Sequence, residues 1–250
     1  MNILVVDLNS KRVSAALTSA FLVIIIVLAS IVGVSYKIFG DNIISAMAGT
    51  SPSEKIIIID AGHGGEDSGA VGVTGVLEKD LNLQMALQIG SEFEERGYVV
   101  VYTRTDDRLL YTEDENIYGI RKISDLKNRV KVAEKYSDAI LVSIHMNSFG
   151  SGKYSGLQVY YSTNKDESKE LADSIQSKVA TELQKDNKRE IKSGKDMYIL
   201  EHVGNTAVLI ECGFLTNEAE CKKLSEKEYQ NQLSFSIVCG IIEYIEKNQK

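Results

Sequence analysis

The chain has 250 residues, of which 44% are hydrophobic and 25% are charged, an ordinary globular composition that suffices for one sizeable α/β domain. Its net charge of −7 argues against nucleic acid as a partner, because nucleic-acid binding requires a basic face. The cysteines, Cys212, Cys221 and Cys239, are odd in number and lack a CxxC spacing, which gives no support for a disulfide framework or a thiolate zinc site.

An uncharged run at 13–36 is long enough to cross the ~30 Å hydrocarbon core of a membrane as a helix. Lys11 and Arg12 precede this run, and cytoplasmic flanks carry the excess of positive charge. We therefore expect a short cytoplasmic N-terminus (1–12), a transmembrane signal-anchor (13–36) and a membrane-anchored catalytic domain outside the cytoplasm.

A cleavable signal peptide is the alternative interpretation of this segment, and it gives a secreted protein. Ala46-Met47-Ala48 resembles a cleavage triplet, but it lies well beyond the apolar run, and that run is longer than the roughly 7–15 residues usual in a signal peptide. Residues 37–54, which include the single proline, Pro52, are predicted to form a tether. Both interpretations place the domain outside the cytoplasm.

Strands and helices alternate from Lys55 onwards, which is typical of a largely parallel sheet. We predict a three-layer α/β fold over 55–248, with a mostly parallel mixed sheet and helices on both of its faces. The expected strands cover 56–60, 98–103, 139–145, 156–162, 197–200 and 206–212, and the expected helices cover 79–96, 124–136, 166–186 and 227–247. The charged segment 105–123 shows no periodicity and is expected to be an exposed loop with a partial helix.

Two of the three histidines, His63 and His145, come at the ends of apolar strands in this pattern. Because ligands bind at the carboxyl ends of the strands in open α/β sheets, the two imidazoles are expected to meet there. A phosphate-binding glycine loop is the alternative for the segment around His63. Asp67 occupies the third glycine position of that motif, however, and the next helix does not begin at once.

Glu78 opens the helix pattern that follows the first loop. The helix dipole alone favours an acid in a first turn, but two strand-end histidines need a third ligand. Two imidazoles and a carboxylate form the three-protein-ligand set of a catalytic zinc with an open position. The sequence therefore predicts a zinc site held by His63, Glu78 and His145. The third histidine, His202, is expected to lie in an exposed turn.

Glu211 ends the most apolar strand of the second half of the chain. A carboxylate in that position is costly to bury unless it is paired or used. We expect Glu211 to accept a proton when water attacks the substrate and to deliver it to the leaving amine, a role that typically contributes about 10²–10⁴-fold.

Four blocks in chain order resemble the zinc-dependent N-acetylmuramoyl-L-alanine amidases, the Amidase_3 family. They are Asp60–Gly65 with Asp67, Gly75-x-x-Glu78-Lys79, Ser143-Ile144-His145-x-Asn147 and Val208–Glu211-x-Gly213-Phe214-x-x-Asn217, with weaker matches at Thr103-Arg104 and Arg129. The resemblance covers nearly all of 55–248. One departure is Thr206, which stands where members of the family often carry proline.

The resemblance implies that Zn²⁺ is held by His63, Glu78 and His145 and that Glu211 is the catalytic acid/base. The implied substrate is peptidoglycan, cleaved at the amide between the lactyl group of N-acetylmuramic acid and L-alanine of the stem peptide. Further substrate contacts are expected at Asn82, Asn147 and Arg129.

The compact layout, with an N-terminal anchor and no wall-binding repeats, resembles the spore-cortex type of this family. That type implies an enzyme between the spore membranes that acts before muramic-δ-lactam forms, a modification needed for germination. The irregular segment 105–123 is a candidate docking site for an accessory activator protein. The competing functions are another zinc peptidase or deacetylase of the cell wall and a non-catalytic scaffold.

Overall fold

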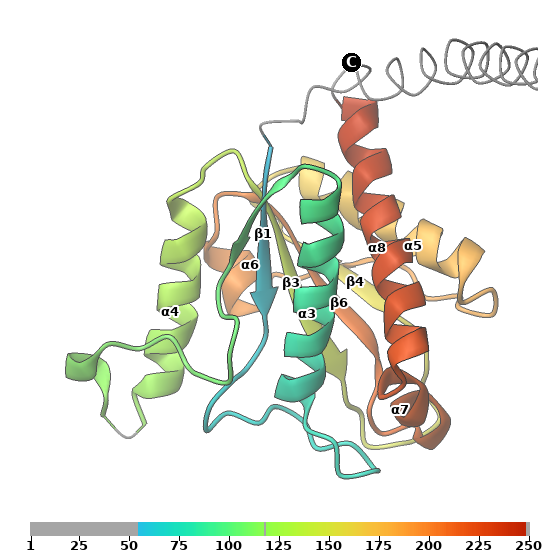
Figure 1. Ribbon diagram of the computed structural model, residues 1–250, viewed down its shortest axis with the longest axis horizontal. Coiled ribbons are helices and arrows are strands. Elements are labelled where there is room, and N and C mark those ends of the chain that lie inside the picture. The colour runs from blue at the N-terminus through green and yellow to red at the C-terminus, as the bar shows by residue number, and fades with distance from the viewer. Residues whose placement is uncertain (1–54, 118, 249–250) are drawn as a thin grey trace, which may run out of the picture. The chain divides into compact units, whose positions relative to one another are not determined.

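The computed structural model describes residues 55–117 and 119–248, arranged as Figure 1 shows. In this part of the chain a six-stranded sheet has the order β2-β1-β3-β6-β4-β5. β4 runs antiparallel to β6, whereas the other neighbouring strands are parallel. The strands are β1 (Ile56–Ala61), β2 (Val99–Tyr102), β3 (Ile140–Asn147), β4 (Gln158–Tyr161), β5 (Lys192–Ser193) and β6 (Thr206–Phe214). The predicted mostly parallel mixed sheet is confirmed.

Helices cover both faces of the sheet (Figure 1), which confirms the three-layer architecture. The helices are α3 (Glu78–Glu95), the 3₁₀ turn η2 (Glu113–Glu115), α4 (Arg121–Glu134), α5 (Glu167–Glu182), α6 (Tyr198–His202), α7 (Glu218–Leu224) and α8 (Lys227–Asn248). α3, α5 and α8 pack over the larger hydrophobic core, and α4 and α6 pack over a smaller core on the opposite face.

β1 begins with four consecutive isoleucines, whose β-branched side chains favour an extended strand. Ile57, Ile58 and Ile59 are fully buried and alternate between the two cores. Burying a side chain of this size stabilises a fold by roughly 1.5–3 kcal/mol. Apolar packing therefore holds β1 on both faces as far as Ile59, and the first polar side chain of the strand is Asp60.

The two faces of the sheet differ near the carboxyl ends of the parallel strands. On the face of the larger core, Ala61 and Ile144 continue the apolar packing. On the α4/α6 face the alternating positions become polar, because side chains point to opposite faces along a strand. Asp60 and Ser143 are register partners on that face. This polar edge is where the candidate site lies.

The strand expected at 197–200 is wrong, because Met197 caps α6 and 198–200 belong to that helix; the additional strand is β5, paired with β4. A short apolar run does not distinguish a strand from a buried helical turn. Ile199 and Leu200 bury their side chains in the smaller core from a helix. The carbonyl of Leu200 accepts hydrogen bonds from Ser162 Oγ (2.7 Å) and Asn164 Nδ2 (3.3 Å), which stabilises the end of this helix.

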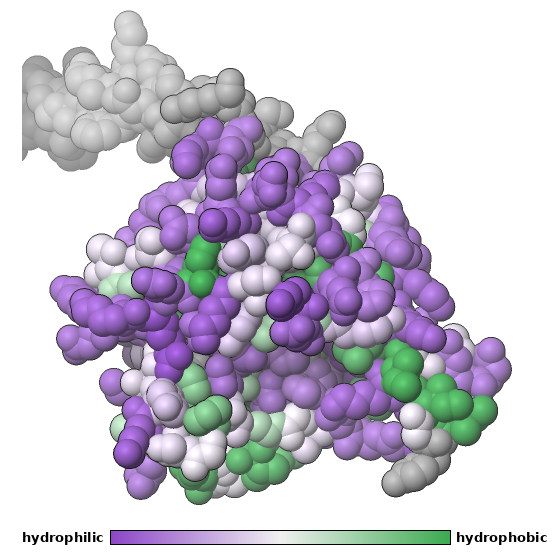
Figure 2. Space-filling view, turned by 180° about the vertical axis from the view of Figure 1, so that it is seen from behind, coloured by the Kyte–Doolittle hydropathy of each residue, from purple (hydrophilic) through white to green (hydrophobic). Residues whose placement is uncertain are grey.

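The segment predicted as an exposed loop, 105–123, projects from the domain and carries η2, at the lower left of Figure 1. Ile117, Ile120 and Ile123 are 54%, 44% and 51% exposed. Figure 2 views the opposite side, and apolar groups gather at this projection, on the lower right. The predicted loop with a partial helix is confirmed.

The predicted cytoplasmic N-terminus (1–12), signal-anchor (13–36) and tether (37–54) lie outside the described residues. Within the part of the chain that the structure describes, no helix is long and apolar enough to span a membrane. The described helices and strands run from Ile56 to Asn248.

Candidate metal centre and active site

His63 lies in a sharp turn directly after β1. Its φ of 61° is a left-handed conformation, which is uncommon for a residue other than glycine and occurs mostly where the surroundings enforce it. Before the turn, Gly62 donates a backbone hydrogen bond to the carbonyl of Ile144 at 3.0 Å, so the chain still follows β3. The turn then directs the imidazole across the polar edge of the sheet.

Two buried arginines hold this turn in place, with exposed fractions of 1% for Arg104 and 2% for Arg129. Arg104 donates to the carbonyls of Ala61 and Gly62 at 2.9 and 3.0 Å. Arg129 donates to those of Ala61 and His63 at 2.6 and 2.7 Å. Three consecutive carbonyls therefore accept from guanidinium groups, which offsets the backbone strain at His63.

Asp60 neutralises Arg129 at the end of β1. Its carboxylate accepts from Arg129 Nη1 (2.7 Å), Thr103 Oγ1 (2.7 Å) and Ser143 Oγ (2.6 Å). Asp125 accepts from Arg129 Nε at 2.8 Å. Burial raises the pKa of Asp60, but Arg129 and the two hydroxyl donors outweigh that effect and hold the pKa below its usual value. The pairing keeps Asp60 charged in the interior.

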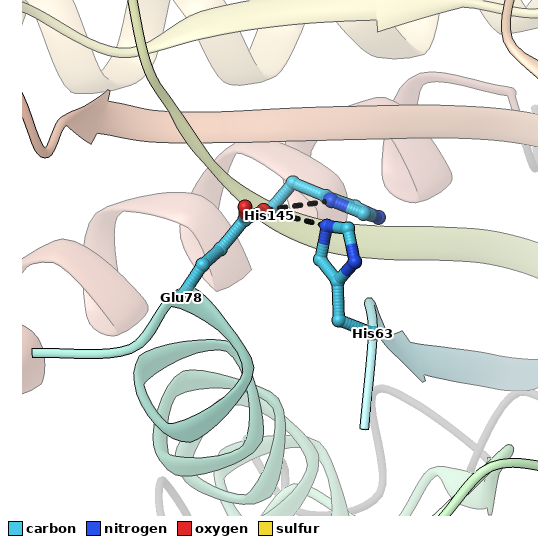
Figure 3. Close-up of side chains that lie close together, drawn as sticks. All are labelled: His63, Glu78 and His145. Carbon is cyan, nitrogen blue, oxygen red and sulfur yellow. Dashed lines mark hydrogen bonds and ion pairs between the residues drawn. The ribbon is translucent and has the colours of Figure 1, made fainter. Parts of the chain in front are cut away.

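Three potential metal ligands converge on the polar edge, as Figure 3 shows. The Oε1 atom of Glu78, at the start of α3, lies 3.2 Å from Nε2 of His63 and 3.0 Å from Nδ1 of His145. One ligand atom from each of the three residues lies within 4.8 Å of the others. The structure thus brings together the three residues that the sequence predicts as zinc ligands.

Two glycines leave the space that this cluster requires. A Cβ atom on Gly62 would lie 2.2 Å from the ring of His145. Gly69 has a φ of 63°, and a Cβ atom there would lie 2.5 Å from Oε2 of Glu78. Any larger residue at either position would displace a predicted ligand.

Asp67 adds a contact that sequence reasoning missed. Its Oδ2 lies 2.9 Å from Nδ1 of His63, so the carboxylate accepts the Nδ1 proton and leaves Nε2 directed at Glu78. A histidine ligand usually donates its second nitrogen to a carboxylate in this way, which fixes its tautomer and orientation. The donor set, two imidazoles and a carboxylate with one imidazole oriented by Asp67, fits zinc. The sequence offered one signal for this contact, because Asp67 lies in the same glycine-rich segment as His63, four residues further on.

The charges in the cluster depend on one another. Burial raises the pKa of Glu78, but hydrogen bonds from His145 and His63 outweigh it and hold the pKa well below the usual range. Burial lowers the pKa of His63, but Asp67 and Glu78 outweigh it and raise the pKa to about 9. The hydrogen bond from His63 holds the pKa of Asp67 well below its usual value. Both carboxylates therefore stay anionic, the form that attracts a cation.

Glu211 lies directly beside His145, because the two are register partners on β6 and β3. Its Oε2 is shielded from solvent and has no hydrogen-bond partner among the described residues. Burial is the main reason that its pKa is raised to about 7; the charge of Glu78 adds to this, and the charges of His145 and His63 oppose it. A half-buried carboxylate with that pKa and a shielded, unpaired oxygen is suited to exchanging protons.

Two of the expected substrate contacts lie in the interior instead. Arg129 holds the turn around His63 and every one of its guanidinium nitrogens has a protein partner, so it is a positioning group that does not face substrate. Asn82 is fully buried and donates to the carbonyl of Gly62 at 3.1 Å. Asn147, at the end of β3, is half-buried, and its substrate contact stays a prediction.

His202, at the end of α6, takes no part in the cluster. Its side chain is 44% exposed, and its ring stacks on that of Tyr198, with centroids 4.0 Å apart. The exposed position expected for it is confirmed, although it ends a helix and does not lie in a turn between strands.

The sequence profile of the N-acetylmuramoyl-L-alanine amidase family, Amidase_3, matches residues 57–243. The chain belongs to this family. The match includes His63, Glu78, His145 and Glu211, together with most of the sheet and helices. The amidase predicted from the motifs is thereby confirmed, and so is its character as a hydrolase of the amide between N-acetylmuramic acid and L-alanine.

Individual relatives of this amidase agree with the family match. A germination-specific N-acetylmuramoyl-L-alanine amidase of Bacillus subtilis is 37% identical over 192 residues, which are 77% of this chain and 80% of that protein. The CwlD amidase of Clostridioides difficile, solved in complex with the GerS lipoprotein, is 40% identical, with a TM-score of 0.74 over 78% of this chain and 100% of that one. The catalytic domain of CwlV from Bacillus (Paenibacillus) polymyxa is 36% identical, with a TM-score of 0.66 over 77% of this chain and 98% of that one.

Proposed function

We propose that this amidase holds Zn²⁺ through His63, Glu78 and His145 and uses Glu211 as its acid/base on peptidoglycan of the spore cortex. One observation carries the chemical part of this proposal. The three donor atoms lie within 4.8 Å of one another, and the unpaired oxygen of Glu211 is on the strand next to His145. A shielded carboxylate oxygen without a partner calls for an explanation, and proton exchange at an adjacent metal centre supplies one.

Zinc, when bound, polarises a carbonyl and lowers the pKa of water. The protein's own part begins with Glu211, whose carboxylate accepts the proton of the attacking water at Oε2. Its pKa of about 7 lets the same group then donate that proton to the leaving nitrogen of L-alanine. Asp67 and the buried arginines contribute by keeping His63 in its strained turn throughout the reaction.

The location of the enzyme rests on the segment before the described domain. The uncharged run at 13–36, preceded by Lys11 and Arg12, supports an anchored protein with its domain outside the cytoplasm. A reporter that is active only outside the cytoplasm should be active when fused after Lys250. Soluble mature protein that begins near Gly49 would instead support secretion after cleavage.

The spore role and the accessory partner rest on relatives. The Bacillus subtilis relative is called germination-specific, and the Clostridioides difficile relative was solved with a lipoprotein. We extend both properties to this chain, with the projecting segment 105–123 as the docking candidate. Deletion of the gene should give spores whose cortex lacks muramic-δ-lactam and which germinate poorly. Normal lactam content would reject the spore role and leave the amidase chemistry intact.

The roles of the side chains are tested by Glu211→Gln, which keeps the shape of the residue and removes its base. The purified full-length variant should retain zinc and lose at least ~10²-fold of its activity on peptidoglycan. Mass spectrometry of the digest should show intact stem peptides with N-terminal L-alanine for the wild type. Glu218→Gln, an exposed carboxylate outside the site, is the matched control. Near-normal turnover of Glu211→Gln would overturn the role of this residue, and loss of zinc would move it into the ligand set.

A further inference from the structure

A row of polar side chains leads away from the metal ligands along the α4/α6 face. His145 on β3 is the register partner of Glu211 on β6, and Glu211 is the register partner of Gln158 on β4. Register partners point to the same face of a sheet, and neighbouring strands lie about 4.8 Å apart. The row therefore extends from the zinc site towards the far edge of the sheet.

Arg189 stands at the outer end of this row. Its Nη1 donates to Oε1 of Gln158 at 3.3 Å, and its Nε donates to the carbonyl of Ser155 at 2.7 Å. Its guanidinium stacks on the ring of Phe214, 4.4 Å from the centroid. Gln158 is itself fixed, because it is 3% exposed and donates to the carbonyl of Glu190 at 2.8 Å. The orientation of Arg189 is thus defined before any ligand arrives.

One nitrogen of this guanidinium remains free to donate a hydrogen bond to a ligand. Its Nη2 has no hydrogen-bond partner among the described residues, whereas Nη1 and Nε are used within the protein. Arg189 also lines a depression of about 680 Å³, where five cations (Arg189, Lys153, Lys185, Lys188 and Lys223) face two acids, Asp186 and Glu220. This surface is therefore rich in cations, although the chain as a whole carries a net charge of −7. The local charge favours an anionic ligand.

We propose that Arg189 binds a carboxylate of the stem peptide and so determines substrate specificity, an inference that rests on the proposed function. Gln158 separates Arg189 from Glu211, which places the guanidinium about 10 Å from the reacting bond at the usual strand spacing. An extended peptide advances about 3.3 Å per residue, so that separation corresponds to two or three residues beyond the cleaved amide. Stem peptides carry free carboxylates at this distance. A planar guanidinium, pre-oriented by stacking, is suited to carboxylates.

The alternative role for Arg189 is structural, because it also joins the chain around Ser155 to Phe214 on β6. The two roles differ in which substrates are affected by its removal. A structural role affects all substrates equally, whereas a carboxylate-binding role affects only substrates that carry the charge. The inference is therefore tested with two synthetic muropeptides, identical except that one has free stem carboxylates and the other has them as amides.

The wild type is expected to prefer the free-carboxylate muropeptide by roughly 10- to 100-fold in kcat/KM, the range of a hydrogen bond to a charged group. Arg189→Gln should lose this preference through a higher KM, with kcat nearly unchanged. Arg189→Lys, which keeps the charge but not the planar fork, should be intermediate. Lys222→Gln removes an exposed cation that pairs with Glu218 outside this depression and, as the matched control, should change the preference less than about threefold.

Equal losses by Arg189→Gln on both muropeptides would overturn the inference, and so would an unchanged preference. If the wild type cleaves neither muropeptide, the proposed function fails. Titration calorimetry with the two free stem peptides then tests carboxylate binding by Arg189 independently of activity. Tighter binding of the carboxylate form by the wild type, but not by Arg189→Gln, supports the inference. Equal affinity of the wild type for both peptides rejects it.

Discussion

Two clusters of charged side chains meet at the end of β1, and they differ in how fully they are paired. Around Asp60 and Arg129, both carboxylate oxygens and every guanidinium nitrogen have protein partners. In the neighbouring cluster, a single oxygen of Glu78, Oε1, contacts both imidazoles, and Oε2 of Glu211 has no partner among the described residues. The paired cluster stabilises the turn, and the incompletely paired one is left open for a ligand. Substitutions in the first should therefore change stability, and substitutions in the second should change metal binding and activity.

The largest effect is expected from loss of a ligand. His145→Ala, or His63→Ala, leaves two of the three proposed ligands. Zinc affinity should therefore fall by more than the ~100-fold that loss of a supporting partner can cost, and activity should become undetectable. Metal analysis after dialysis against a mild chelator measures this, together with a peptidoglycan digest. His202→Ala is the control, because that imidazole is exposed and lies outside the cluster. Stoichiometric zinc in either variant would disprove the ligand assignment.

Arg129→Met tests the paired cluster. It leaves Asp60 and Asp125 buried without their cation, which typically costs about 3–5 kcal/mol of the free energy of unfolding. Chemical denaturation of the metal-free protein should show this loss. Arg108→Met is the matched control, because Arg108 pairs with Asp106 at the surface, where both side chains are more than half exposed and the expected change is below ~1 kcal/mol. A loss in Arg129→Met no larger than that of the control would show that the pairing does not hold the turn.

Asp67 contacts the imidazole of His63 in the incompletely paired cluster, and its substitution should give a smaller effect. In Asp67→Asn the amide NH₂ can donate to Nδ1 of His63. This favours the tautomer that carries its proton on Nε2, and a protonated Nε2 cannot bind zinc. Zinc affinity should fall by about 10–100-fold, the usual cost of losing such a partner, while the unfolding free energy changes little. Competition with a fluorescent zinc chelator measures the affinity. Glu66→Gln, an exposed neighbour that pairs with Arg121, should leave the affinity unchanged; equal losses in both variants would assign the effect to general surface charge.

Much of the fold and the convergence of His63, Glu78 and His145 could be predicted because the signals are local. The isoleucine run of β1 and the apolar run before His145 identify strands, and strand ends meet at one edge of a parallel sheet. Other features depend on tertiary contacts that no local pattern encodes. The apolar residues of α6 pack into the smaller core from a helix, a conformation that their short run does not specify. Arg129 is internal because Asp60 and Asp125 neutralise it. Arg189 precedes a two-residue strand without periodicity, so only the register of β4 and β6 places it near Glu211.

The smallest effect is expected in the acid stability of the metal-free protein, and it isolates Asp60. The pKa of Asp60 is lower in the folded state than its ordinary value of 3.8, so its charge stabilises the fold above that pH. This contribution is lost as the pH falls below about 4 towards the folded-state pKa, because the unfolded chain then binds one more proton. Asp60→Asn is less stable at neutral pH, yet its unfolding free energy should fall less steeply between about pH 4 and pH 2, by up to ~1.4 kcal/mol per pH unit. Urea titrations at several pH values, with chelator present, measure both slopes. Parallel slopes in the two proteins would mean that Asp60 titrates alike in the folded and unfolded states, and that its pairing with Arg129 does not keep it charged.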